Sequence, residues 1–145
     1  MLPYLIYPII AFIIAQGTKI IIKIIRNRSF HWHDIFAYSD MPSGHTATVT
    51  SLSTIVLLRD GLYSASFAIA FVFMLIIVTD AIGLRNYLGQ HGKTLNILVK
   101  DLKEDDFLDD YYPNLLERIG HTPIQVIIGA IIGIVVSTLG WQLGF

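Results

Sequence analysis

Long apolar runs constrain this chain more than any other feature of its sequence. Residues 2–25, 61–79 and 122–145 are each mostly apolar, and a helix needs about 20 such residues to cross the hydrocarbon core of a bilayer. Of the 145 residues, 54% are hydrophobic and only 14% are charged, which excludes an ordinary soluble domain. Because backbone polar groups in lipid must be paired within a helix, we predict an all-α, multi-pass membrane protein.

A fourth run, residues 43–58, is shorter and rich in serine and threonine. This composition favours a central helix packed among other helices over one that faces lipid. The short turn at Arg59–Gly61 makes it the antiparallel neighbour of the next run. Without repeats or low-complexity tracts, residues 1–145 are predicted to form one domain, a bundle of about four transmembrane spans.

One long polar insertion separates the last two runs. Leucines between residues 88 and 102 recur at helical spacing and predict an amphipathic helix that could lie on the membrane surface. An acidic stretch follows, made of Asp101, Glu104, Asp105, Asp106, Asp109 and Asp110. Carboxylates one turn apart could share a magnesium ion, but no second acidic cluster completes such a site, so a solvated loop is favoured.

Several function classes are disfavoured by composition. The net charge of −1 gives no basic bias toward nucleic acid, and the absence of cysteine removes disulfides and thiolate chemistry. His31 and His33 could be taken for a metal site, but a pair of loop histidines is more often interfacial. The first run lacks a basic leader and is interpreted as a retained helix. No metal or cofactor is expected.

Four helices that alternate across a membrane bring particular segment ends to one face. These ends carry unusual polar residues: Lys19, Arg26, Pro42–His45, Asp80, Arg85 and His121. Charge at the edge of hydrocarbon is costly, and a bound phosphate would explain its convergence. Arginine and lysine neutralise phosphate oxygens, and the helix start at Ser43 and Gly44 adds amide donors. Of two histidines, one can attack phosphorus and the other can protonate the leaving alcohol, without a metal.

These residues resemble the type 2 phosphatidic acid phosphatases, and within them the divergent group related to vanadium haloperoxidases. Lys19 and Arg26 keep the spacing of that family's first motif, with Asn27 in place of the usual proline. The second motif, proline-serine-glycine-histidine, is intact at residues 42–45. The third is split by the insertion, with its arginine half at Arg85 and its histidine half at residues 121–126.

The resemblance implies a role for each matched residue. His121 would be the nucleophile and His45 the general acid, and the phosphate ligands would be Lys19, Arg26, Ser43, Gly44 and Arg85, with Arg118 as a competitor of Arg85. Gln125 stands where a carboxylate would orient the nucleophilic histidine, and glutamine brings no charge. Asp80 is predicted to supply that carboxylate; otherwise the chain would be slow or inactive.

The resulting hypothesis is a metal-independent phosphatase for a lipid phosphate or diphosphate monoester, such as a polyprenyl diphosphate, phosphatidylglycerol phosphate or phosphatidic acid. A haloperoxidase is disfavoured, since that activity belongs to soluble relatives. The alternative is a non-catalytic protein that binds anionic lipid, or a scaffold or transport subunit. The expected partners are the lipid substrate and membrane lipids; the oligomeric state, including a homo-oligomer, is left open.

The distribution of cations predicts the orientation in the plasma (inner) membrane. With the candidate site residues set aside, the site face still carries Arg28, Lys93, Lys100 and Lys103, against Arg59 alone on the other face. Because lysine and arginine mark cytoplasmic loops, the site is predicted to face the cytoplasm and both termini to face outward.

Overall fold

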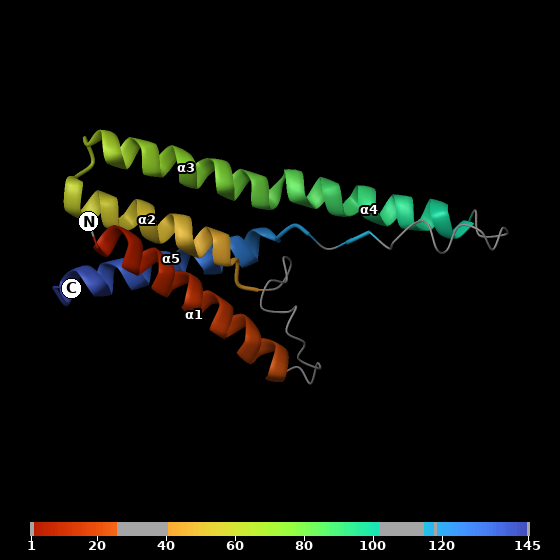
Figure 1. Cartoon of the computed structure of the whole chain (residues 1–145), viewed down its shortest axis with the longest axis horizontal. Coiled ribbons are helices and arrows are strands. Elements are labelled where there is room, and N and C mark those ends of the chain that lie inside the picture. The colour runs from red at the N-terminus through yellow and green to blue at the C-terminus, as the bar shows by residue number, and fades with distance from the viewer. Residues whose placement is uncertain (1, 26–40, 102–114, 118, 145) are drawn as a thin grey trace.

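The computed structural model describes residues 2–25, 41–101, 115–117 and 119–144, and every regular element among them is an α-helix (Figure 1). The helices are α1 (Pro3–Ile25), α2 (Gly44–Asp60), α3 (Ala65–Ile82), α4 (Leu84–Asp101) and α5 (Pro123–Gln142). The all-α prediction is confirmed, and the apolar runs of the sequence correspond to α1, α2, α3 and α5.

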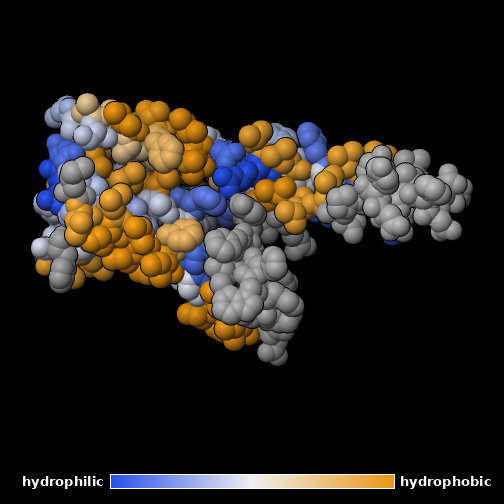
Figure 2. Space-filling model, viewed as in Figure 1, coloured by the Kyte–Doolittle hydropathy of each residue, from blue (hydrophilic) through white to orange (hydrophobic). Residues whose placement is uncertain are grey.

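Helices α1 and α5, and the stretch formed by α3 and α4, have the length and composition of membrane spans. Three helical stretches of the described residues could cross a bilayer: Pro3–Ile25, Ala65–Lys100 and Pro123–Gln142. Apolar side chains cover most of the bundle in Figure 2, whereas hydrophilic side chains gather at its left end and where α3 passes into α4. This distribution suits an apolar belt in lipid between two polar faces. The chain is therefore a multi-pass membrane protein.

Helix α2 forms the centre of the bundle. It contacts α1, α3 and α5, and its hydroxyl side chains at Thr46, Thr50, Ser51 and Ser53 are buried. Small hydroxyl residues suit helix contacts in a membrane because they allow close approach and can hydrogen-bond across the interface. The prediction of an enclosed central helix is confirmed.

Helices α2 and α5 run side by side in the same direction. A Cβ atom on Gly129 would lie 2.5 Å from the Ser43 carbonyl oxygen, and one on Gly133 would lie 2.5 Å from the Ala47 carbonyl oxygen. One turn further, the Ser51 and Ser137 hydroxyl oxygens are 2.7 Å apart. These small residues bring the two backbones together, so α2 and α5 begin at the same end of the bundle.

A cluster at the opposite end joins three helix termini. The Arg59 guanidinium lies 5.4 Å from the centre of the Tyr4 ring and 5.8 Å from that of Trp141, and the Tyr4 hydroxyl donates a hydrogen bond to Asp60. Cation–π contacts of this kind stabilise a helix end where aromatic rings meet the membrane interface. The cluster ties the start of α1 to the ends of α2 and α5.

Helix α4 continues the line of α3 beyond the end of the bundle (Figure 1). The two are interrupted only at Gly83, whose N–H bonds to the Thr79 carbonyl at 2.8 Å and whose carbonyl accepts from Tyr87 N–H at 3.1 Å. Because hydrogen bonds persist on both sides of the interruption, the helical direction is maintained. The amphipathic helix expected near residues 88–102 thus exists, but it projects from the bundle instead of lying across its end.

Candidate active site

Lys19 occupies the interior face of α1. Tyr7, Ala11, Ala15 and Lys19 follow one another at four-residue spacing and are all buried, as expected for one stripe of a helix. The Lys19 side chain is only 5% exposed. Lysine is almost never buried to this extent without a compensating partner. The anion-binding role that the sequence suggests for Lys19 stays a prediction.

The start of α2 is held by a side-chain cap. The Ser43 hydroxyl accepts hydrogen bonds from Thr46 N–H at 3.4 Å and from the Thr46 hydroxyl at 3.0 Å. Ser43 thus has a structural task, and its fully buried hydroxyl caps the helix. Gly44 packs against α1, since a Cβ there would lie 3.3 Å from the Phe12 ring.

The start of α5 lies directly beside the start of α2. Ser43 N–H donates to the Gln125 carbonyl at 3.1 Å, which joins the two helix ends. Thr122 caps α5, and the Gln125 side-chain oxygen accepts from Thr122 N–H at 2.8 Å to complete a capping box. Two parallel helix N-termini at one level add their dipoles and create a positive potential there.

His121 immediately precedes that capped helix and is only 2% exposed. Its N–H donates to the Ala81 carbonyl at 3.0 Å, and its carbonyl accepts from the Asn86 side-chain amide at 3.2 Å. Both the N–H and the carbonyl of His121 are therefore hydrogen-bonded to residues at the junction of α3 and α4. Both ring nitrogens are inaccessible to water.

His45, the second residue of α2, is exposed. In the part of the chain that the structure describes, the charged groups that act on it electrostatically are Arg85, Lys19 and Asp80. These three come from α4, α1 and α3, respectively. The same end of the bundle thus collects an accessible histidine, two cations and a carboxylate.

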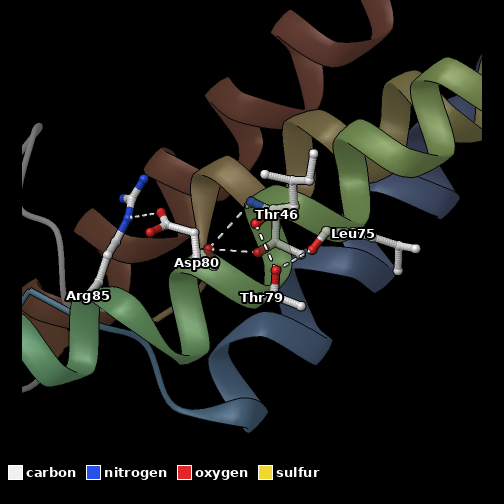
Figure 3. A network of polar contacts seen from close by, with 7 residues as sticks. Thr46, Leu75, Thr79, Asp80 and Arg85 are labelled. Carbon is white, nitrogen blue, oxygen red and sulfur yellow. Dashed lines mark hydrogen bonds and ion pairs between the residues drawn. The ribbon is translucent and has the colours of Figure 1, made fainter.

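Asp80 and Arg85 point toward each other across the junction of α3 and α4 (Figure 3). The Arg85 Nε donates to Asp80 Oδ2 at 2.5 Å, and both side chains are partly buried. A carboxylate on Nε holds the planar guanidinium in one orientation while the terminal Nη groups point away. Asp80 is thus arranged to position Arg85, whereas the sequence assigned it to His121; that assignment stays a prediction.

The structure brings together most of the residues that the sequence singled out: Lys19, Ser43, Gly44, His45, Asp80, Arg85 and His121 all lie at one end of the bundle. Arg26 and Arg118 lie outside the described residues, as do His31, His33 and the acidic stretch from Glu104 to Asp110. Sequence reasoning missed Asn86. Its signal was its position next to Arg85, but only the fold shows that it contacts His121.

Among the described residues, no group of three or more histidine, aspartate or glutamate side chains is placed so that it could hold a metal ion. The donors that do converge there are cationic groups, helix N-termini and imidazoles. This set suits a phosphate group, because phosphate is recognised by charge-assisted hydrogen bonds and helix N-termini. An imidazole beside a bound phosphate can act as nucleophile or as general acid.

Comparisons with known proteins give a family match and a relative. A family model described as the Divergent PAP2 family matches residues 2–136. An uncharacterized membrane protein of Bacillus subtilis (strain 168), YuiD, is 36% identical over 136 residues, which cover 88% of this chain and 86% of the relative. No solved structure matches.

Proposed function

Since the chain belongs to the divergent PAP2 family, we propose that it is a metal-independent phosphatase. Its substrate would be a lipid phosphate or diphosphate monoester of the polyprenyl diphosphate, phosphatidylglycerol phosphate or phosphatidic acid class. It would act in the plasma membrane, with the site at the cytoplasmic face. The proposal is supported most by the buried Lys19 beside the paired starts of α2 and α5, with both histidines at that same end.

The proposed reaction has two steps. A neutral imidazole nitrogen of His121 attacks phosphorus, the bond from phosphorus to the leaving oxygen breaks, and protonated His45 gives its proton to that oxygen. His45 then takes a proton from water, whose oxygen attacks the phosphohistidine. Phosphate leaves, His121 recovers its electron pair, and His45 is protonated again. Lys19, Arg85 and the helix N-termini would stabilise the charge on the phosphate oxygens.

The burial of His121 sets a condition on this reaction. Because its ring nitrogens are inaccessible to water, the lipid phosphate must displace the groups that cover the ring before attack. His45, by contrast, is exposed and can exchange protons with water. A protected nucleophile and an accessible acid suit an enzyme that reacts with its bound substrate and admits water afterwards.

The test is phosphate release from a panel of the three lipid classes in detergent, with EDTA present. We expect release from at least one class, inhibition by vanadate, and loss of release in His121→Ala. His91→Ala is the matched control, since His91 is an exposed histidine of α4 and its loss should leave the rate unchanged. Dependence of release on an added divalent metal would contradict metal independence.

One observation favours a second candidate, a non-catalytic protein that binds anionic lipid. Gln125 stands where a carboxylate would support the nucleophile, and its side-chain oxygen is used in the α5 cap. Such a protein would bind lipid phosphate, and vanadate would compete with the lipid. It would release no phosphate from any member of the panel, which separates it from the enzyme.

A further inference from the structure

An extended segment leads along α4 to His121. It comprises the described residues 115–117 and 119–121 and runs antiparallel to the helix. Near the far end of α4, Asn96 Nδ2 donates to the Leu115 carbonyl and Leu115 N–H donates to Asn96 Oδ1, both at 2.9 Å. The amide side chain thereby pairs with both polar groups of one residue's main chain. This pairing fixes the register of the segment, because a one-residue shift would break both bonds.

Two glycines allow the segment to lie directly against the helix. A Cβ on Gly89 would lie 2.5 Å from the Glu117 carbonyl oxygen, and one on Gly92 would lie 2.7 Å from the Leu116 carbonyl oxygen. Separations this short are incompatible with any side chain unless the backbone moves. The two positions thus need glycine for contact with the segment, although glycine weakens a helix.

The near end of α4 holds His121 itself. Asn86 Nδ2 donates to the Ile82 carbonyl at 2.7 Å and to the His121 carbonyl at 3.2 Å. His121 N–H donates to the Ala81 carbonyl at 3.0 Å. The helix is interrupted at Gly83, so the carbonyls of Ala81 and Ile82 are available to these side-on donors.

The four α4 residues lie on one face, since positions 86, 89, 92 and 96 are spaced by three or four residues. We propose that Asn86, Gly89, Gly92 and Asn96, here called the α4 track, are positioning residues that set the place of His121 in the active site. This inference rests on the proposed function. It explains how Arg85 and His121 can act together although a long insertion separates them in the sequence. Helix α4, which is part of the insertion, binds the segment that leads to His121 and so holds His121 near Arg85.

The packing of α4 supports a positioning role over a general structural one. Among the described helices α4 contacts α3 alone, and its leucines 88, 95 and 98 are exposed. It therefore adds little to the core of the bundle. Its closest contacts outside α3 are with the segment that ends at His121.

Gly89→Ala tests the track, with Gly17→Ala as the matched control. Alanine is the better helix former at both positions, but a Cβ at Gly17 meets nothing within 4 Å, whereas one at Gly89 meets the segment. We expect kcat to fall on the order of 10- to 100-fold in Gly89→Ala, as for a misplaced catalytic group, with KM nearly unchanged. Gly17→Ala and the exposed-face variant Gln90→Ala should keep the kcat of the wild type.

A second readout does not depend on turnover. In this cysteine-free chain, His121→Cys places one thiol at a site that is nearly inaccessible. We expect a maleimide to label it slowly in detergent, and several-fold faster when Gly89→Ala is added, but not when Gly17→Ala is added. Asn86→Asp should accelerate labelling too, since it removes the amide donor to the His121 carbonyl while keeping the size of the side chain.

The two readouts separate the track from the proposed function. Unchanged labelling and unchanged kcat in both Gly89→Ala and Asn86→Asp would overturn the track, whatever the activity of the wild type. Accelerated labelling in a protein that releases no phosphate would keep the track and overturn the phosphatase. A fall in kcat equally large in Gly17→Ala would also count against the track, because the loss would then not depend on the contact.

Discussion

At the scale of single residues, the candidate site contains charged and imidazole groups in environments that ordinarily disfavour them. Lys19 and His121 are both buried and lie at one end of an apolar bundle. Burial of a cation costs free energy that a protein of this size must recover elsewhere. Under the proposed function, a phosphate near Lys19, Arg85 and the two helix starts would interact favourably with these groups.

Asp80 offers a prediction at this scale. If it acts by orienting Arg85, Asp80→Asn should raise the KM for lipid phosphate on the order of 10- to 100-fold, because the charge-assisted bond is worth about 1.5–3 kcal/mol and each 1.4 kcal/mol is about tenfold. In an Arg85→Ala background the same change should have almost no further effect. A double-mutant cycle on KM and kcat measures this coupling. A fall in kcat that persists in the Arg85→Ala background would instead support Asp80 as the partner of His121.

The site could be predicted from sequence only in part, and the reason is physical. Lys19, His45, Arg85 and His121 are recognisable because charge and imidazole are rare in apolar surroundings. Asn86 carries no such signal, because an asparagine in a polar helix is ordinary. The sequence position of Gln125 indicates only a missing carboxylate, whereas its capping role depends on the backbone of Thr122, three residues earlier.

At the scale of helices, close packing of α2 against α5 places the two helix starts side by side. Gly133 allows that approach, with the Ala47 carbonyl 2.5 Å and Ser51 N 2.8 Å from where a Cβ would stand. Gly133→Ala should therefore destabilise the protein by about 1–3 kcal/mol, the usual cost of overpacking. The melting temperature in detergent measures the effect. An equal melting temperature for Gly133→Ala and wild type would contradict tight packing here.

The helices themselves were largely predictable, because bilayer thickness limits the length of an apolar run. The direction of α4 was not. Amphipathic spacing indicates a helix and its apolar face but carries no information on the angle at Gly83. The sequence pattern does not predict the extended segment on α4 either. That segment is held by tertiary contacts with glycine and asparagine and not by periodic apolar residues.

At the scale of the whole molecule, the α3–α4 stretch of 36 residues would be about 54 Å long at 1.5 Å per residue. The hydrocarbon core is about 30 Å thick, so α4 reaches well beyond it on the face of the site. Among the described basic residues, Lys93 and Lys100 lie on α4 and Arg85 at its start, whereas Arg59 lies at the other face, where α1 begins and α5 ends (Figure 1). We therefore predict that α4 projects into the cytoplasm.

Single cysteines test this orientation. Tyr63 is 100% exposed in the turn between α2 and α3, and Lys93 is exposed on α4. An impermeant thiol reagent applied to intact cells should label Tyr63→Cys and not Lys93→Cys, and both should be labelled after permeabilisation. The reverse pattern would overturn the cytoplasmic placement of the site without affecting its chemistry.

The central claim is that His121 carries phosphate during turnover, and trapping the phosphoenzyme tests it most directly. Protein mixed with a radiolabelled lipid phosphate is quenched in alkali, where phosphohistidine survives, and the label on the protein is measured. The account predicts label on the wild type, none on His121→Ala, and more on His45→Ala with a good leaving group, since hydrolysis then lacks its base. Equal labelling of wild type and His121→Ala would contradict it.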